Sequence, residues 1–321
     1  MNALVCGAGG FIGSHLVKRL VADGYWVRGV DIEEPEFERS AAHEFIIGDL
    51  RVDEVCNKAV YGMDDVFQLA ATMGGIGFIT QKLAEVARDN VLINTHMLSA
   101  AKEQHIHKFF FSSSACVYNT FMQAALDAKP LSEEDAWPAM PERGYGLEKL
   151  FSEELCQYFK QDFGLETRIT RFHNCYGPLG KYDGGREKAP AALCRKIASV
   201  QDGGTIEVWG DGLQRRSFLY IDDCVEGILR IMQSNYPYPI NLGSDRLVSI
   251  DELVEIIARI SGKSFSVIHN PRQPQGVRGR NSDNTRLKQV TGWVPGIPLE
   301  KGLTDTYRWV LEQVRRNVEG Q

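Results

Sequence analysis

A tyrosine and a lysine, Tyr145 and Lys149, stand four residues apart in a segment whose pattern predicts a helix. This spacing places both side chains on one face of that helix. A phenol with an ordinary pKa near ~10 is a weak base at neutral pH, but an adjacent ammonium group and a cationic cofactor ring both favour the phenolate. Tyr145 is therefore a candidate proton acceptor for a hydroxyl group. By itself, the same pair is also typical of an ordinary amphipathic surface.

A serine and a cysteine follow a predicted strand at Lys108–Ser112. Ser114 lies just past the strand end, where it could hydrogen-bond the same hydroxyl as Tyr145. Cys116 carries a thiol with an ordinary pKa near ~8.5, which neighbouring cations lower, and such a thiol is a competent base for a C–H proton beside a carbonyl. Inversion at that carbon needs a second group on the opposite face. Lys188 is the candidate, although its position before a predicted helix also suits a solvated lysine.

A glycine-rich motif, Gly7-Ala8-Gly9-Gly10-Phe11-Ile12-Gly13, connects the first predicted strand to the first predicted helix. In this context, backbone N–H groups and the positive end of the helix face a pyrophosphate. Asp31, at the end of the second strand, can accept hydrogen bonds from a ribose diol and would repel a 2′-phosphate, which favours NAD over NADP. The alternative is a tight turn without a ligand. The candidate cofactor contacts are Gly7, Gly10, Phe11, Ile12, Gly13, Asp31, Asp49, Leu50, Leu69, Ala70, Ala71, Tyr145 and Lys149.

Secondary-structure elements must position these residues. In the first half of the chain, short apolar runs alternate with longer amphipathic ones, a pattern that predicts a parallel sheet with crossover helices. Strands are predicted at Ala3–Cys6, Trp26–Asp31, Glu44–Ile47, Asp65–Leu69, Lys108–Ser112 and Thr167–Arg171. Helices are predicted at Phe11–Ala22, Val52–Val60, Thr80–Glu103 and Tyr145–Phe163. We expect an α/β fold, a Rossmann-type doubly wound parallel sheet with a smaller, interleaved C-terminal substrate-binding domain. Such sheets bind ligands beyond the carboxyl ends of their strands.

Beyond Asn174 the chain becomes richer in glycine, proline and charged residues. Ile221–Met232 and Tyr238–Leu242 nevertheless predict a helix and a strand that return to the cofactor domain. We therefore expect an NAD-binding domain over residues 1–175 and about 218–242, and a substrate domain over about 176–217 and 243–321. Two more helices are predicted at Ile250–Ser261 and Leu299–Val318.

Composition limits the classes of function. The 321 residues include 36 Lys and Arg against 42 Asp and Glu, a net charge of −6, so nucleic acid is not expected as a partner. Seven cysteines without C-x-x-C spacing argue against a disulfide framework and a metal site. We find no signal or membrane-spanning run and expect a cytoplasmic protein.

One local basic patch suits a diphosphate, or else is a solvated loop. Its members are Arg272, Arg278, Arg280, Arg286 and Lys288, and the same stretch contains the single carboxylate Asp283.

Together these motifs resemble the extended short-chain dehydrogenase/reductase family, over nearly the whole chain. The resemblance rests on the glycine motif, the strand-end Asp31, the serines before Val117-Tyr118, the Tyr145 to Lys149 motif and Arg171-Phe172-His173-Asn174-Cys175-Tyr176-Gly177-Pro178. It implies transient oxidation of a nucleotide-linked sugar by tightly bound, recycled NAD. A dehydratase of the family would have Asp-Glu where Ala115-Cys116 stand, so dehydration is disfavoured.

Longer strings resemble the branch of that family that inverts C3 and C5 of GDP-mannose, among them Ala71-Thr72-Met73-Gly74-Gly75 and the segment 184–192. By this resemblance Cys116 and Lys188 are the epimerising acid and base, while Tyr145, Lys149 and Ser114 carry the redox step. The implied products are GDP-L-galactose and, as a side product, GDP-L-gulose. The implied substrate contacts are Gly74, Ser114, Ala115, Cys116, Asn174, Glu187, Lys188, Ala189, Lys196, Gln214, Arg215, Arg216 and Arg280.

The family also implies a homodimer through Thr80–Glu103 and Tyr145–Phe163. Two departures affect the sugar preference: Thr72 stands where the family more often has Asp, and Asn119-Thr120 replace Pro-Glu. The sequence therefore leaves open a 4-epimerase, an epimerase of another GDP-sugar such as a heptose, and a non-catalytic NAD-sensing module. A sensing module would be expected to lose the tyrosine and lysine pair, which is present here.

Overall fold

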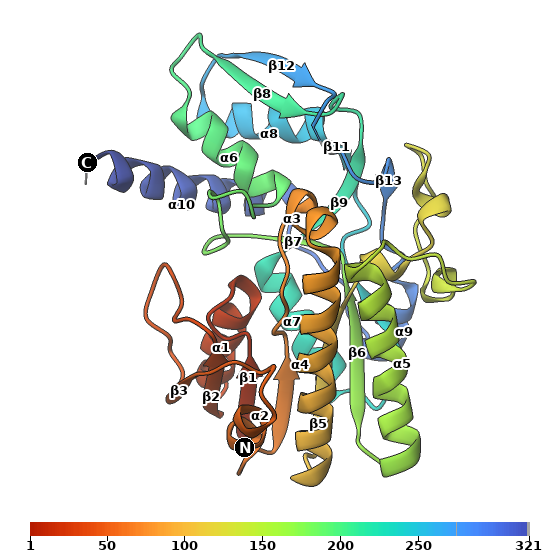
Figure 1. The fold of residues 1–321 in the computed structure, drawn as a ribbon. Helices are drawn as coiled ribbons and strands as arrows, with labels where there is room; N and C mark the ends of the chain where they lie inside the picture. The colour runs from red at the N-terminus through yellow and green to blue at the C-terminus, as the bar shows by residue number, and fades with distance from the viewer. Residues whose placement is uncertain (274, 320–321) are drawn as a thin grey trace.

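The structure, a computed structural model, describes residues 1–273 and 275–319 (Figure 1). Residues 274, 320 and 321, part of the predicted substrate domain, lie outside the described residues. The strands are β1 Asn2–Cys6, β2 Trp26–Asp31, β3 Glu44–Ile47, β4 Asp65–Gln68, β5 Lys108–Ser114, β6 Thr167–Phe172, β7 Asn174–Tyr176, β8 Thr205–Trp209, β9 Arg215–Tyr220, β10 Ile240–Leu242, β11 Leu247–Ser249, β12 Ser266–Asn270 and β13 Gly279–Arg280. The helices are α1 Phe11–Ala22, α2 Asp53–Val60, α3 Ile76–Gln81, α4 Leu83–Glu103, α5 Tyr145–Phe163, α6 Ala189–Ser199, α7 Ile221–Gln233, α8 Ile250–Ser261, α9 Thr285–Thr291 and α10 Leu299–Glu319, with 3-10 turns η1 Ala115–Val117, η2 Thr120–Gln123 and η3 Glu133–Ala136.

The central sheet has seven strands in the order β10-β6-β5-β4-β1-β2-β3, and all of its pairs are parallel. The predicted Rossmann-type parallel sheet is therefore confirmed. The direction of winding reverses between β1 and β4, which is the place where sheets of this kind bind a ligand.

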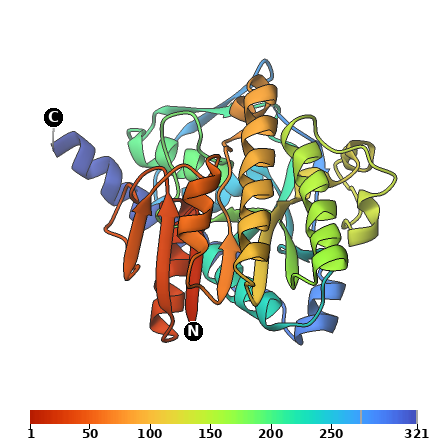
Figure 2. The same ribbon diagram turned by 60° about the horizontal axis from the view of Figure 1, so that its bottom comes forward.

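Alternation along the strands explains how both faces of the sheet become covered. In β1, Ala3 and Val5 pack with the residues of α1 and α7, whereas Leu4 and Cys6 pack with those of α2, α4 and α5. Successive side chains of a strand point to opposite faces, so a buried parallel strand needs apolar residues at every position. Figure 2 shows α4 and α5 side by side along one face of the sheet.

The second half of the chain adds two small sheets, one of β11, β9, β13 and β7 and one of β8 and β12. Helices α6, α8 and α10 pack together with them. In Figure 1 this upper part lies beyond the carboxyl ends of the central strands. Between its two stretches of chain, α7 packs on α1 and β10 pairs with β6, so residues 221–242 lie with the central sheet.

The prediction of one continuous helix over Thr80–Glu103 is wrong. The chain forms α3 and α4, separated at Lys82, whose φ of −114° and ψ of 39° are not helical. Leu83 packs against the turn at Gly144 that precedes α5, and Ile79 on α3 belongs to the same buried cluster as Cys116. Because no glycine or proline marks the break, tertiary packing overrides local helix propensity here.

Candidate active site

The glycine motif forms a tight turn between β1 and α1. Gly7 has a φ of +75°, a conformation that favours glycine, and a Cβ on Gly13 would lie 2.0 Å from the Gly7 carbonyl oxygen. Gly10 caps α1 without a side-chain hydrogen bond, and the first turn of α1 contains no acidic residue. The N–H groups at this helix end are therefore free of local side-chain acceptors, as binding of a pyrophosphate requires.

Asp31 lies beside this turn, where its carboxylate accepts hydrogen bonds from the Gly9 and Ile32 N–H groups at 2.8 and 2.7 Å. Burial raises the pKa of Asp31 from its usual range, while these hydrogen bonds oppose the shift. Asp49 is held differently, because both of its oxygens accept from Arg51, and these contacts lower the pKa of Asp49. The Leu50 side chain is buried in the core.

Residues Leu69, Ala70 and Ala71 follow β4 at the same sheet edge. The Leu69 N–H donates to the Cys6 carbonyl at 3.2 Å, and a Cβ on Gly7 would lie 2.9 Å from the Ala70 nitrogen. This segment thus packs against the glycine turn. Together with Phe11 and Ile12 in the first turn of α1, these residues surround the place where the winding of the sheet reverses.

Four of the five predicted catalytic residues come together at the end of β5. Ser114 caps η1, and its hydroxyl accepts a hydrogen bond from the Cys116 N–H at 3.2 Å. Tyr145 begins α5 and packs with Cys116 in one cluster of buried residues. The Lys149 ammonium lies 4.8 Å from the Phe111 ring centroid and 5.6 Å from that of Tyr145. The serine, thiol, phenol and ammonium groups therefore share one site.

Burial controls protonation at this site. It raises the pKa of the Tyr145 phenol well above its ordinary value, although a hydrogen bond with Ser114 opposes the shift. It also lowers the pKa of Lys149. The sequence-based expectation that nearby cations lower the pKa of the Cys116 thiol is not met: burial raises it, the Glu142 carboxylate raises it further, and the Arg280 guanidinium only partly opposes them.

Arg280 is the cation beside the thiol. Its Nη1 lies 3.7 Å from the Cys116 Sγ, its Nε donates to the Gln123 Oε1 at 2.5 Å, and its Nη2 donates to the Glu142 carboxylate. The side chain is only 8% exposed. Arg216 lies opposite Arg280 in the pairing of β9 with β13, and burial together with the Arg280 charge lowers the pKa of Arg216 to about 9.

Lys188, the fifth predicted catalytic residue, caps α6 with extended backbone angles, and its side chain is half-buried. The neighbouring Arg186 guanidinium stacks on the Phe78 ring at 4.4 Å, and Phe78 packs against the cluster that contains Cys116. A Cβ on Gly75 would lie 3.0 Å from the Glu187 carbonyl oxygen. The segment that carries Lys188 therefore lies against the loop that also borders Cys116.

The remaining predicted substrate contacts lie around this center, on several elements. Gly74 packs on Phe78, and Ala189 begins α6. Asn174 donates to the Ser217 carbonyl at 3.0 Å, and Glu187 accepts from the Gly185 N–H at 2.7 Å. Lys196 donates to the Glu207 carbonyl at 2.7 Å, and Arg215 lies 3.8 Å from Glu252. Gln214 donates to the Trp209 carbonyl at 3.1 Å, and its buried Oε1 has no hydrogen-bond partner among the described residues. That oxygen is available to a ligand.

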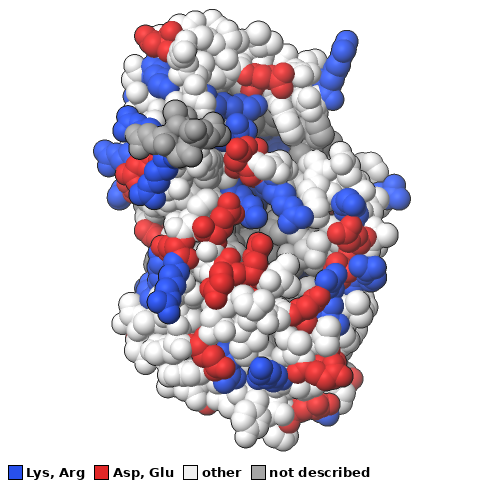
Figure 3. All heavy atoms as spheres, turned by 60° about the vertical axis from the view of Figure 1, so that its left-hand side comes forward, with Lys and Arg blue, Asp and Glu red and all other residues white. Residues whose placement is uncertain are grey.

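The predicted basic patch is not a single patch. Arg278 pairs with Asp211 at 2.9 Å, Arg280 with Glu142, and Arg286 with Glu133 at 3.5 Å. These acids belong to distant segments, so a count of charges along residues 272–288 does not reveal them. Figure 3 shows instead that the surface is hollowed at mid-height, where Lys and Arg side chains gather together with Asp and Glu.

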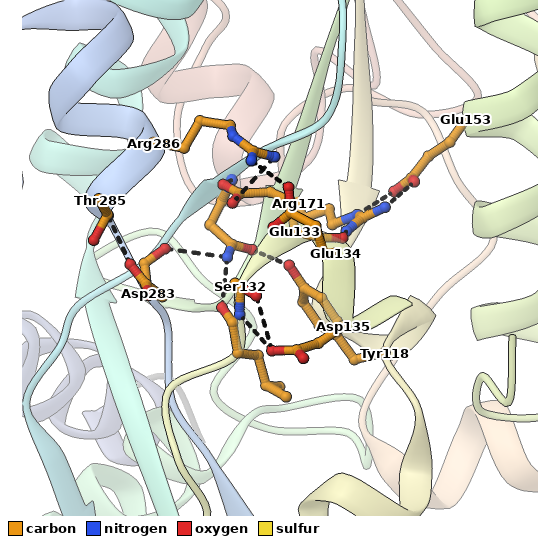
Figure 4. A network of polar contacts seen from close by, with 12 residues as sticks. Tyr118, Ser132, Glu133, Glu134, Asp135, Glu153, Arg171, Asp283, Thr285 and Arg286 are labelled. Carbon is orange, nitrogen blue, oxygen red and sulfur yellow. Dashed lines mark hydrogen bonds and ion pairs between the residues drawn. The ribbon is translucent and has the colours of Figure 1, made fainter. Parts of the chain in front are cut away.

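A polar network connects the segment that follows Arg280, which contains Asp283 and Arg286, to residues 132–135 and to the central sheet (Figure 4). Arg171 on β6 makes a buried ion pair with Glu153 on α5 at 2.6 Å and donates to the Glu133 carbonyl at 2.6 Å. Leu131 pairs with Ser282, two residues beyond Arg280. These contacts hold residues 131–135 between β6 and the strand that presents Arg280.

The sequence did not single out Glu142 or Gln123. Glu142 lies three residues before Tyr145, and its N–H donates to the Cys116 carbonyl at 3.0 Å. Gln123 is fully buried. Neither residue belongs to a motif, and only their proximity to Arg280 in the folded chain identifies them. Among the described residues, no group of three or more His, Cys, Asp or Glu side chains is placed to hold a metal ion.

All seven cysteines are buried and free. In the described part of the chain, no helix combines the length and the apolar character needed to cross a membrane.

Comparison with known proteins bears directly on this site. Residues 3–243 match the model of the NAD dependent epimerase/dehydratase family. The chain is 48% identical over 314 residues to GDP-mannose 3,5-epimerase 1 of Oryza sativa subsp. japonica, covering 97% of this chain and 82% of that protein. UDP-glucose 4-epimerase of Thermotoga maritima, solved with UDP-glucose, superimposes with a TM-score of 0.88 at 26% identity, covering 98% and 100% of the two chains. UDP-glucuronic acid 4-epimerase of Bacillus cereus, solved with UDP-glucuronic acid and NAD, gives a TM-score of 0.81 at 27% identity over 98% and 100%.

Proposed function

Since the chain belongs to the NAD dependent epimerase/dehydratase family, we propose that it inverts C3 and C5 of GDP-mannose through a transient 4-keto sugar and yields GDP-L-galactose. Inversion at C5 alone would yield GDP-L-gulose. The observation that carries this proposal is the position of the Cys116 thiol, which lies beside Ser114 and Tyr145 and is paired with Arg280. At this position the thiol gives the redox site a base that can remove a proton from carbon.

The residues at the glycine turn fit NAD. The N-terminus of α1, which has no side-chain cap, suits its pyrophosphate, and the Asp31 carboxylate suits a ribose diol and disfavours a 2′-phosphate. When bound, NAD would supply the positive charge that favours the Tyr145 phenolate and a reversible hydride acceptor for C4. Because the hydride is returned, the cofactor is recycled and no external reductant is consumed.

Three residues serve the redox step at C4. The Tyr145 phenolate accepts the proton of the C4 hydroxyl, and Ser114 hydrogen-bonds the same oxygen. The Lys149 ammonium, close to the phenol ring, stabilises the phenolate. In the last stage the phenol returns its proton to the C4 oxygen, so that the site ends in its starting protonation state.

Two residues serve the inversions. The C4 carbonyl acidifies the C–H bonds at C3 and C5, and Cys116 removes the C5 proton, leaving an enolate. Lys188 then delivers a proton to the opposite face of C5. Once Cys116 has released this proton to solvent and Lys188 has taken one up, the same pair repeats the exchange at C3 before C4 is reduced. Lys188 is a suitable second group because its segment packs against the loop that borders Cys116.

The nucleotide-sugar would contact residues around this center. The orphaned Gln214 Oε1 can accept a hydrogen bond, and Lys196, Arg215 and Arg216 supply positive charge for the diphosphate. We assign Arg280 to the sugar end of the site, since it is buried against Cys116. The other proposed contacts are Gly74, Asn174, Glu187 and Ala189.

Turnover of GDP-mannose in D₂O tests this function. A 3,5-epimerase must place solvent deuterium on C3 and C5 of the sugar, whereas a 4-epimerase leaves protium at both carbons. We expect deuterium at both carbons of the inverted sugar with the wild-type protein, and no inverted sugar with Cys116→Ala or Lys188→Ala. Absence of exchange in the wild type, or full exchange in both variants, would overturn the proposal.

A second candidate function is epimerisation of a related GDP-sugar, such as a heptose, or a 4-epimerisation. Thr72 favours this alternative because its loop borders the sugar site and the family more often has Asp there. Mass spectrometry of the nucleotide-sugar that copurifies with the protein would identify its natural substrate.

We also propose a homodimer formed through α4 and α5. On α5 the apolar side chains of Leu147, Phe151 and Tyr158 are 58%, 48% and 51% exposed, and on α4 Leu92 is 37% exposed. Exposed apolar residues that form a stripe along two packed helices are typical of a partner surface. We further propose the cytoplasm as the compartment, because seven free cysteines suit a reducing environment.

A further inference from the structure

The Arg280 guanidinium is held by three groups that use three different nitrogens. Gln123 accepts from Nε at 2.5 Å, the Glu142 carboxylate accepts from Nη2, and the Cys116 Sγ lies 3.7 Å from Nη1. Gln123 is itself fixed, since its Nε2 donates to the Tyr118 and Asn119 carbonyls at 3.3 Å each. The planar guanidinium therefore has one defined orientation.

Glu142 is connected to Cys116 by a second, independent contact. The Glu142 N–H donates to the Cys116 carbonyl at 3.0 Å. Its carboxylate is 17% exposed and shares the guanidinium with the thiol. Glu142 and the Cys116 sulfur are thus two acidic groups that compete for one buried cation.

The other groups that face the thiol come from several elements. From α5 come the Tyr145 phenol and the Lys149 ammonium, and from β9 comes Arg216. The side of the thiol toward α3 and α4 is apolar and consists of Ile79, Val86, Met73 and Phe78. Among the charged groups around the Cys116 thiol, Glu142 is therefore the carboxylate that contacts Arg280, the cation beside the thiol.

We propose that Glu142 is a positioning residue that, together with Gln123, orients Arg280 toward Cys116 and sets how readily the thiol gives up its proton. The proposal rests on the proposed function for the role of Cys116 as base and acid. A group in that role must both lose and regain a proton in each cycle. A guanidinium left without a carboxylate would favour the thiolate and hinder reprotonation; one neutralised by Glu142 allows both states.

The electrostatics of the site agree with this geometry. Burial raises the pKa of the Cys116 thiol, the Glu142 charge raises it further, and Arg280 lowers it. Substitution of Glu142 by Gln removes the negative charge but retains a carbonyl oxygen that can accept from Nη2. The orientation of Arg280 is then kept while its charge is no longer shared.

Alkylation of the NAD-loaded protein by iodoacetamide tests the proposal. The rate is measured between pH 6 and 10, and peptide mass spectrometry follows modification of Cys116 alone. We expect Glu142→Gln to lower the midpoint of the pH profile by about one pH unit, in the range typical for loss of a close charge. Glu142→Asp retains the charge and should keep a midpoint close to that of the wild type.

The substitution Gln123→Glu provides a test with the opposite sign, because it adds a carboxylate at Nε. It should raise the midpoint, and the double variant with Glu142→Gln should return it toward that of the wild type. If the ion pair only supports the fold, these substitutions alter stability and leave the midpoint unchanged. An unchanged or raised midpoint in Glu142→Gln, with the remaining cysteines still protected, overturns the proposal.

This titration does not depend on turnover. Failure of deuterium exchange at C3 and C5 would overturn the proposed function but would not alter the midpoint of Cys116. Conversely, normal exchange with an unchanged midpoint in Glu142→Gln would overturn only the role of Glu142. The two experiments therefore separate the two proposals.

Discussion

Gly146 and Cys116 pack so closely that a Cβ on Gly146 would lie 2.2 Å from the Cys116 carbonyl oxygen. Gly146 is the second residue of α5, and Cys116 lies in η1. This contact seats the beginning of α5 directly on the turn after β5. It thereby fixes Tyr145 beside the thiol, and it explains why the residue after Tyr145 has no side chain.

The first prediction concerns this contact. Gly146→Ala should cost about 1–3 kcal/mol of stability through overpacking, and it should reduce turnover by about 100-fold because the phenol moves relative to the sugar. Urea unfolding and turnover of GDP-mannose measure the two effects. Gly77→Ala is the control, since a Cβ on that glycine meets no atom within 4 Å beyond its chain neighbours and its own helix backbone. If Gly146→Ala retains wild-type turnover, the contact does not position Tyr145.

The second prediction is a pH dependence that arises from Glu148. Burial raises the pKa of this carboxyl from 4.5 to about 7, although Lys149 and a hydrogen bond from Asn90 oppose the shift. The folded chain thus binds the Glu148 proton more tightly than the unfolded chain does. The stability that this proton contributes is fully present below about pH 4.5 and is lost as the pH rises to about 7.

Glu148→Gln removes this titration. Relative to the wild type, the variant should gain up to about 3 kcal/mol of unfolding free energy between pH 4.5 and pH 8. Urea unfolding at a series of pH values measures the difference. A difference that stays constant over this range, or one that falls with rising pH, would contradict the assignment.

The third prediction concerns the cofactor. Asp31→Asn removes the negative charge beside the glycine turn. It also weakens the hydrogen bonds that the Gly9 and Ile32 N–H groups donate to this side chain. Affinity for NAD should fall by about tenfold, the loss expected for a charged hydrogen bond, while discrimination against NADP should weaken. Fluorescence titration with both cofactors measures the ratio. Glu33→Gln removes an exposed charge nearby and should leave that ratio unchanged.

The fourth prediction concerns assembly. Phe151→Glu places a charge in the apolar stripe of α5 and should convert the proposed dimer into a monomer, as measured by sedimentation equilibrium. Phe121→Glu is the matched control, because Phe121 is 73% exposed but lies on η2. A dimer that persists in Phe151→Glu would place the interface elsewhere.

Local signals in the sequence determined much of this protein. The strands β1 to β6 follow from their apolar runs, and the glycine turn, Asp31 and the pair Tyr145 and Lys149 follow from their spacing. Each of these signals depends on residues close together in the chain, where hydrophobic periodicity and backbone geometry are sufficient. No strand was predicted at β7 to β9 or at β11 to β13. Of these, β7, β11 and β13 span only two or three residues, which is too few for an apolar period to show.

The environment of Cys116 arises from contacts between segments that lie far apart in the chain. Arg280 lies 164 residues from Cys116 in the chain, and no spacing rule connects them or brings Glu142 and Gln123 to the same guanidinium. The sequence-based expectation of a lowered thiol pKa counted nearby cations but could not include burial. Desolvation depends on every element packed around a group, so its effect on the thiol is known only once the chain is folded.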